Sequence, residues 1–384
     1  MDKRVWFFLT AVLAIGLLIV PLVAPAPAYA DKLSDAIAKT PQGAGKGQID
    51  PKAKPGYLGI PGGPSVNPLL ALLWATWVGW IFSTVGAFGG IMAGVGHITV
   101  FGLANYGKTF KDTSPVLNKV ITDSIRVSNQ YLVGLSGLIS SINYWRMGRL
   151  VLPLGLALAL GSMIGATVIA NATAGKLSVS SYVGIFGILV LILGGFLVYN
   201  ITPRGQASKK AAKAAVQAFE SAVKEKKDTA DQGVKILKWG LIKTLFTFYG
   251  VEFKFNPLVA ILGGLVIAGI SALIGVGGGF LLVPYMTALV GVPMFIAAGT
   301  SAFAVLVSMI TSIFNFMVIK GVMVSWGLIG IELVGIFIGS MVGPRTSKYI
   351  PEKWLQIIFI VLSFYVGVGY ATKGFLGQSL LPGM

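Results

Sequence analysis

Long apolar stretches, separated by shorter polar segments, run along most of the chain. They cover residues 69–103, 120–144, 150–170, 182–201, 257–290, 295–319, 323–341 and 355–371. A membrane-spanning helix needs about 20 apolar residues, so each stretch predicts at least one membrane segment. The pattern therefore predicts an all-α, polytopic membrane protein.

The N-terminal part of the chain predicts two segments outside this pattern. Residues 1–30 begin with basic residues, continue with an apolar run and end with small residues at Ala28 and Ala30, as a cleaved signal peptide does. An uncleaved anchor helix is the alternative, because the run is just long enough to span a bilayer. Residues 31–66 are rich in Pro, Gly, Ala and Lys and predict an extracytoplasmic loop.

A polar linker at 202–256 divides the apolar stretches into two groups. It holds 11 basic residues against 5 acidic ones, and such an excess beside membrane segments marks the cytoplasmic side. Its Ala/Lys/Glu-rich part, 207–230, predicts a solvated helix. Lysines mixed with large apolar residues at 234–249 predict a helix in the membrane interface, either a regulatory or lipid-sensing element or a plain tether.

Three short sequence matches, in the same order on both sides of this linker, predict an internal duplication. They pair 85–90 with 274–279, 140–144 with 311–316, and 160–166 with 338–344. We therefore expect two homologous halves, 67–201 and 257–384, of about four or five membrane segments each.

The first apolar stretch of each half contains a glycine cluster that predicts a broken helix. In the second half, Gly275, Gly277, Gly278 and Gly279 are followed by Pro284, and each glycine weakens a helix by roughly 1 kcal/mol relative to alanine. Paired breaks in two repeats indicate a transporter's substrate site, whereas close helix packing is the alternative. If both broken stretches double back, the halves are inverted repeats; if each is a single span, they are parallel.

Composition narrows the class of function. Only 11% of the residues are charged, whereas a soluble domain carries about a quarter, so a soluble enzyme is excluded. The net charge is +17, and the charged residues lie between the apolar stretches. This distribution indicates orientation in a membrane rather than nucleic-acid binding. With no cysteine and a single histidine, His97, we expect no metal site and no other cofactor. No Walker motif follows the glycines, which argues against ATP hydrolysis.

Several motifs of the second half form a recognisable series within about 120 residues: Gly275-Val-Gly-Gly-Gly279, Pro284, Gly291-Val-Pro293 and Ala297-Ala-Gly-Thr-Ser301. This series resembles the sulfite exporter TauE/SafE family, a group of bacterial inner-membrane anion permeases. The first half is a weaker copy, with Phe88 in place of Gly277 and Thr122-Asp-Ser124 in place of Gly-Thr-Ser. The resemblance implies transport of sulfite-like sulfur oxyanions or organosulfonates.

Neutral hydrogen-bond donors are the predicted ligands of such an anion. Unwound glycine backbone exposes N–H groups, and a ring of neutral donors binds an oxyanion without holding it too tightly. The candidate substrate-binding residues are Gly89, Gly90, Gly277, Gly278, Gly279, Gly299, Thr300 and Ser301. The alternative role of Thr300 and Ser301 is to cap the following helix.

Ionisable residues within or near the apolar stretches are candidates for coupling transport to a proton or sodium gradient. Glu332 lies among apolar residues, where the charged form of its carboxylate is disfavoured. We therefore expect it to be either a proton carrier or a partner for a basic residue such as Arg126. Asp123 and Arg126, three residues apart, share a helix face and can form an ion pair. His97 is either a proton relay or a packed, hydrogen-bonded residue.

These observations favour a secondary transporter with a small anionic substrate, surrounded by membrane lipid and without catalytic activity. An anion channel, or a permease for another small organic anion, is the alternative. An intramembrane protease of the rhomboid type would need a Gly-x-Ser-x-Gly motif to accompany His97, and the sequence contains none. A purely structural membrane protein gives no reason for broken helices.

Overall fold

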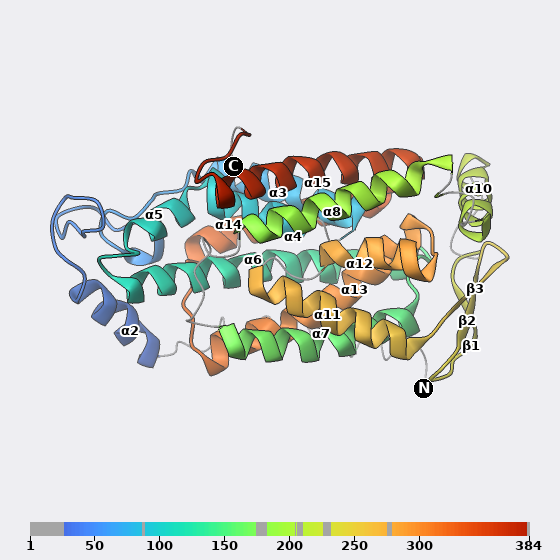
Figure 1. Ribbon diagram of the computed structural model, residues 1–384, viewed down its shortest axis with the longest axis horizontal. Helices are drawn as coiled ribbons and strands as arrows, with labels where there is room; N and C mark the ends of the chain where they lie inside the picture. Colours follow the sequence, from blue (N-terminus) through green and yellow to red (C-terminus); the bar gives the residue numbers. More distant parts are fainter. Residues whose placement is uncertain are drawn as a thin grey trace.

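The computed structural model describes residues 27–86, 89–173, 183–203, 205, 210–225, 232–274 and 279–381. The expected signal peptide or anchor at 1–30 lies almost wholly outside the described residues, and so do Gly277 and Gly278. The described residues form a bundle of long helices with a small β-sheet at one end (Figure 1).

The first half of the chain opens with a long helix, a short helix that ends in a π-helical turn, and a further short helix. Three long helices follow. The bounds are α3 (Pro68–Val85), α4 (Gly89–Val95) with its π turn η2 (Gly96–Val100), α5 (Leu103–Thr109), α6 (Pro115–Arg146), α7 (Leu152–Thr173) and α8 (Val183–Ile201).

The second half has a similar order of elements. The bounds are α11 (Pro257–Ile274), α12 (Gly279–Tyr285) with its π turn η4 (Met286–Val290), α13 (Met294–Ile313) with its π turn η5 (Phe314–Ile319), α14 (Trp326–Ser347) and α15 (Glu352–Phe375). Among the described residues, the segments long and apolar enough to cross a membrane by length and composition are Met294–Ile319, Trp326–Ser347 and Lys353–Phe375.

The first helices of the two halves begin with the same local signal. Asn67 precedes Pro68, and its side-chain oxygen accepts a hydrogen bond of 2.9 Å from the backbone N–H of Leu69. Asn256 precedes Pro257 and accepts in the same way, at 2.9 Å, from Leu258. An asparagine N-cap followed by proline in the first turn is a strong helix start.

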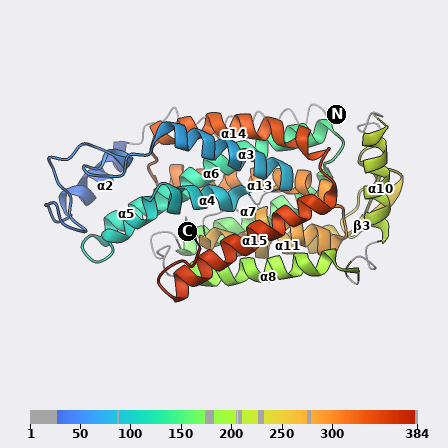
Figure 2. The same ribbon diagram turned by 90° about the horizontal axis from the view of Figure 1, so that it is seen from above.

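The broken segment doubles back in both halves, but in opposite directions (Figures 1 and 2). α3 runs toward the end of the bundle that carries the sheet, and α4 returns from it. α11 runs away from the sheet, and α12 returns toward it. The later helices keep this opposition: α6 runs toward the sheet and α13 away from it, while α7 runs away and α14 toward it.

Helices of one half pack chiefly against helices of the other. The principal pairs are α3 with α14, α7 with α11, α6 with α13, and α8 with α15. Glycines allow the first two pairs to approach closely. A Cβ added to Gly339 would lie 2.0 Å from the carbonyl oxygen of Thr76, and one added to Gly161 would lie 1.9 Å from that of Ile261.

The glycines that occupy equivalent positions in these two helix pairs are not the ones that the sequence match aligned. Gly335 would touch the carbonyl of Leu72 and Gly339 that of Thr76, while Gly161 and Gly165 would touch those of residues 261 and 265. By contact, Gly161 therefore corresponds to Gly335, although the sequence match at 160–166 paired it with Gly339. The alignment of α7 with α14 by contacts therefore differs from the alignment by sequence by one helical turn.

The polar linker corrects two expectations. Its first part contains a helix, α10 (Lys210–Lys224), which confirms the helix expected at 207–230 within the described residues. The prediction of an interfacial helix at 234–249 is wrong, and the predicted all-α fold class is wrong for this segment. The chain forms an antiparallel sheet of order β1-β2-β3, with β1 at Lys235–Lys238, β2 at Thr244–Phe248 and β3 at Val251–Phe255.

Alternation explains why a sheet forms here. Phe246, Phe248, Phe253 and Phe255 are buried, and less buried residues lie between them. Phe246 stacks on Phe253, its partner across the hairpin, with ring centroids 5.3 Å apart. Tyr249 and Gly250 connect the strands with φ angles of 50° and 75°, the backbone that a tight two-residue hairpin turn requires.

The segment at 31–66 is not wholly a loop, because helix α2 (Pro27–Ala38) extends into it. Leu33 and Ala36 are buried on one face of α2. Thr40, just after the helix, donates a hydrogen bond of 2.8 Å to Ser114 at the start of α6. This segment lies at the opposite end of the bundle from α10 and the sheet (Figure 1).

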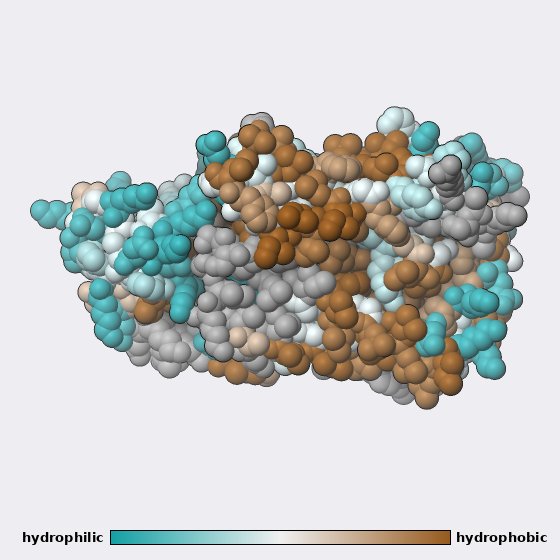
Figure 3. All heavy atoms as spheres, viewed as in Figure 1, coloured by the Kyte–Doolittle hydropathy of each residue, from teal (hydrophilic) through white to brown (hydrophobic). Residues whose placement is uncertain are grey.

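The outer surface is divided by polarity along the bundle. Figure 3 shows apolar side chains over the middle of one face and hydrophilic side chains at its two ends. Leu160, Ile164, Leu262 and Val266 are among the large apolar residues that remain exposed. Exposed apolar surface over the helices, with polar ends, is the distribution expected of a protein embedded in a bilayer.

The glycine contacts predict a difference between two substitutions in α14. Gly339→Ala places a methyl group against the Thr76 carbonyl and is expected to destabilise the protein by about 1–3 kcal/mol, because the helices must separate. Gly330→Ala, in the same helix, has nothing within 4 Å and should leave stability unchanged or slightly raised. Thermal unfolding in detergent measures both, and equal midpoints for the two variants would contradict the packing.

Candidate functional site

The break in the first half contacts the second half directly. Gly86, at the C-terminus of α3, has a φ of 92°. A Cβ added there would lie 2.6 Å from Cγ2 of Val283 in α12, 3.3 Å from the Cα of Ala298 in α13, and 3.4 Å from the hydroxyl oxygen of Ser301. The first break therefore lies against α12 and α13, where only glycine fits.

The other predicted glycine ligands are divided between described and undescribed residues. Gly89 and Gly90 are buried at the start of α4. A Cβ on Gly89 would lie 2.4 Å from the side chain of Phe82, so this glycine allows α4 to fold back on α3. Gly279 begins α12, whereas Gly277 and Gly278 lie outside the described residues. Anion binding by these glycines stays a prediction.

The expectation for Gly299, Thr300 and Ser301 needs correction. All three lie inside the continuous helix α13, so their backbone N–H groups are not those of an unwound segment. They also do not cap α13, which begins at Met294. The Thr300 hydroxyl instead accepts a hydrogen bond of 3.1 Å from the backbone N–H of Val151, just before α7. Only side-chain hydroxyls remain as possible anion donors here.

A row of polar side chains on α6 lies near the Gly86 break. Ser136, Ser140 and Tyr144 are spaced four residues apart and therefore share one helix face. The Ser136 hydroxyl lies 2.7 Å from that of Ser340 in α14. The Tyr144 hydroxyl donates a hydrogen bond of 2.5 Å to the backbone carbonyl of Ser83 in α3. The row faces α3 and α14, next to the break at Gly86.

Two buried hydroxyls in this region are unsatisfied. The oxygens of Thr84 and Ser140 are buried and have no hydrogen-bond partner among the described residues. Thr84 is two residues from Gly86, and a Cβ on Gly343 would lie 3.0 Å from its hydroxyl oxygen. Buried polar atoms normally have partners, so these hydroxyls are candidate ligand donors.

A second polar cluster joins three elements nearer the end that carries α2. His97 in η2 contacts Glu332 in α14, with Nε2 and Oε2 3.0 Å apart. Its other ring nitrogen, Nδ1, lies 2.5 Å from Oδ1 of Asn129 in α6. All three side chains are buried. The suggested pairing of Glu332 with Arg126 is therefore wrong, and two predicted coupling residues, His97 and Glu332, contact each other instead.

The Glu332 carboxylate is only half satisfied. Its Oε2 atom contacts His97, whereas Oε1 is buried with no hydrogen-bond partner in the described part of the chain. Because a buried ionisable residue inside a helical membrane protein is costly, the His97–Glu332 pair is a candidate functional site.

Tyr57 closes this region from the α2 end. It lies in a short 3₁₀ turn, η1 (Tyr57–Gly59), and its hydroxyl is 2.9 Å from that of Ser124 in α6. Burial raises the pKa of Tyr57 to about 12, with smaller opposing contributions from hydroxyls including that of Ser124. The phenol therefore stays neutral at physiological pH.

The remaining pair of candidates behaves as an ion pair on one helix. Arg126 Nη1 lies 3.2 Å from Asp123 Oδ1, three residues away on α6. The Arg126 guanidinium lies 4.9 Å from the ring centroid of Phe316, and Lys320 approaches the same ring. This geometry confirms the expected contact between Asp123 and Arg126 and separates their pairing from that of His97 and Glu332.

The helical bundle, its apolar exposed surface and the helix break at Gly86 are typical of a membrane transporter. The family model of the sulfite exporter TauE/SafE matches residues 71–370, which is most of the chain. The chain belongs to this family of membrane transporters of sulfur anions. No curated protein and no solved structure gave a match to it.

Proposed function

We propose that this protein is a secondary transporter that moves sulfite-like oxyanions or organosulfonates across the bacterial inner membrane. The observation that carries the proposal is the contact of the Gly86 break with α12 and α13 of the other half. A helix break that is covered by the opposite half, at the centre of the bundle, provides unwound backbone beside polar side chains.

The two halves act as inverted repeats in this proposal. Three observations support it. Corresponding helices run in opposite directions, and the first helix of each half starts with Asn-Pro, at Asn67 and Asn256. The pairing of α3 with α14 and of α7 with α11 also stays the same when the two halves are exchanged. Inverted halves allow one half to rock against the other, so that a central site opens to each side of the membrane in turn.

The anion site is formed by hydroxyls and backbone around the end of α3. Thr84 and Ser140 contribute unsatisfied hydroxyls, and Ser301 lies beside Gly86. The Ser301 hydroxyl now donates to the carbonyl of Ala298 at 3.0 Å, a local bond that rotation of the side chain can exchange for an anion. Neutral donors bind an oxyanion with enough affinity to select it and let it leave.

The His97–Glu332 pair couples this movement to protons. Its members come from η2, which continues the broken segment, and from α14, which packs on α3. A change in the protonation of this pair therefore acts on two elements that move apart when one half rotates against the other. Asp123 and Arg126, with charges already paired on one helix, serve instead as a largely buried structural ion pair.

Flux measurements in proteoliposomes test the transported class of anion. We expect uptake of sulfite or an alkanesulfonate, but not of acetate, and a loss of about tenfold or more in transport efficiency for Ser140→Ala and for Ser301→Ala, because each removes a hydrogen bond to a charged ligand. Ser141→Ala is the matched control, since its hydroxyl already bonds the Gly137 carbonyl of the same helix. Equal transport of acetate would favour a permease for other organic anions.

Replacement of Glu332 by glutamine tests the coupling. Glu332→Gln keeps the shape of the side chain but cannot ionise, so we expect loss of proton-driven accumulation with anion exchange retained. His97→Gln should have the same effect, and the double variant should be no worse, because both residues serve one proton site. Asp123→Asn should leave the pH dependence of uptake unchanged. A well-folded Glu332→Gln protein with normal pH-dependent uptake would remove Glu332 from the mechanism and make Asp123 the next candidate.

Single cysteines test the sidedness, since the native chain has none. Ser34 and Ser221 are both exposed, in α2 and α10 at opposite ends of the bundle. With the linker 202–256 cytoplasmic and 31–66 outside, a membrane-impermeant maleimide should label Ser34→Cys in intact spheroplasts and leave Ser221→Cys unlabelled until the membrane is opened. Labelling of Ser221→Cys in intact spheroplasts would overturn this assignment.

A further inference from the structure

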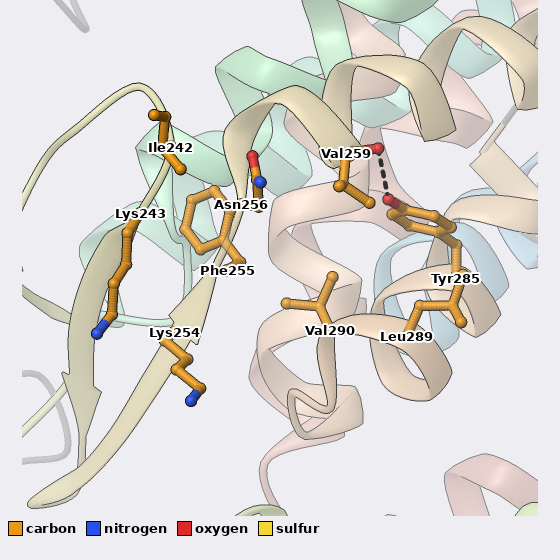
Figure 4. Close-up of a pocket in the computed structure, with 9 residues that line it drawn as sticks. All are labelled: Ile242, Lys243, Lys254, Phe255, Asn256, Val259, Tyr285, Leu289 and Val290. Atoms are coloured by element: carbon orange, nitrogen blue, oxygen red, sulfur yellow. Dashed lines mark hydrogen bonds between the residues drawn. The ribbon is translucent and has the colours of Figure 1, made fainter.

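A groove lies where the β-sheet meets the helical bundle (Figure 4). It has a volume of about 520 Å³ and is bounded on one side by the β2–β3 hairpin and on the other by the start of α11 and the turn η4. The lining residues are Ile242, Lys243, Lys254, Phe255, Asn256, Val259, Tyr285, Leu289 and Val290. None of them belongs to the central site described above.

Two lysines give the groove a positive side. In the hairpin, Lys254 pairs with Leu245, so Lys243, two residues before Leu245, lies diagonally across on the same face. Both lysines are exposed, and Figure 4 shows their ammonium groups on the same side of the hairpin. The groove therefore presents two neighbouring cations to a ligand.

The opposite wall of the groove is apolar. Val259 is 52% exposed and Leu289 is 73% exposed, with Val290 beside them. The Tyr285 hydroxyl donates a hydrogen bond of 2.8 Å to the carbonyl of Val259, which fixes the end of α12, where η4 begins, against α11. Along α11 the exposed apolar surface continues through Leu262 and Val266 toward the middle of the bundle.

The loop between β1 and β2 adds apolar side chains at the same end of the molecule. Trp239, Leu241 and Ile242 are among the exposed residues of this loop, and Leu241 reaches 82% exposure. Exposed tryptophan and aliphatic residues beside lysines are typical of a surface that sits at the boundary between lipid chains and headgroups. The groove thus lies where the apolar band of the bundle ends and the basic linker begins.

We propose that this groove binds an anionic phospholipid, with the phosphate between Lys243 and Lys254 and an acyl chain along Val259, Leu289 and the exposed face of α11. The two walls together select this ligand class. A soluble anion would use the lysines but leave the apolar wall exposed, whereas a lipid without net charge would use the apolar wall without a counter-ion for the lysines. The site is independent of which anion the protein transports.

Lipid titrations followed by native mass spectrometry test the proposal on the full-length protein in detergent. The probes are phosphatidylglycerol and phosphatidylcholine with identical acyl chains. The test variant is Lys243→Ala/Lys254→Ala, and the control is Lys235→Ala/Lys238→Ala, which removes two exposed lysines from β1 of the same sheet. Leu289→Glu tests the apolar wall.

Phosphatidylglycerol should bind the native protein and the β1 control with similar affinity. The Lys243→Ala/Lys254→Ala variant should bind it about 30-fold more weakly, at roughly 1 kcal/mol per lysine. Leu289→Glu should also weaken binding, and inorganic phosphate should not compete. The proposal is overturned if phosphatidylcholine binds equally well, if the two double-lysine variants lose affinity equally, or if inorganic phosphate displaces the lipid, which would indicate a site for soluble anions.

Discussion

Backbone groups at a helix break cannot face lipid, because no water is available there to satisfy them. This constraint explains why helices of one half pack against helices of the other rather than within their own half. The end of α3 at Gly86 is covered by α12 and α13, while α3 itself is held by α14 through Gly335 and Gly339. Without such cross-half contacts, the break that supplies the polar centre would be too costly to form.

The two halves have a similar order of helices but different buried side chains. By the contacts of their glycines, Gly161 corresponds to Gly335, so Leu158 stands where the second half has Glu332. Only one side of the bundle thus carries this buried carboxylate. Its desolvation is offset by His97, which Asn129 orients through the other ring nitrogen. The ionisable pair joins the two halves, because His97 lies in the first half and Glu332 in the second. In the proposed cycle, a change in its protonation therefore acts on the contact between the halves.

The sequence predicts the elements that depend on local composition, but not those that depend on contacts between distant residues. The helices in the apolar stretches, the end of α3 at Gly86 and the helix at Lys210–Lys224 follow from propensity and length, and each is present among the described residues. The sequence predicts an interfacial helix at 234–249 instead of the sheet, because lysines mixed with large apolar residues are also typical of such a helix. Tyr249-Gly250 forms the hairpin turn without the Asn or Asp that marks such a turn in a sequence. Asn129 and Tyr57 gave no local signal, since their importance arises only where α6, η1 and η2 meet.

The direction of the helices has a consequence for how such a molecule could arise. α3 and α4 enter and leave the bundle at the same end, after which α6, α7 and α8 each run from one end to the other. A unit with an odd number of full traversals finishes on the side opposite to its start. Tandem duplication of a gene for that unit therefore inserts the second copy upside down, with no change of targeting signal. Parity alone yields the inverted arrangement proposed here, and a linker confined to one side is sufficient to join the copies.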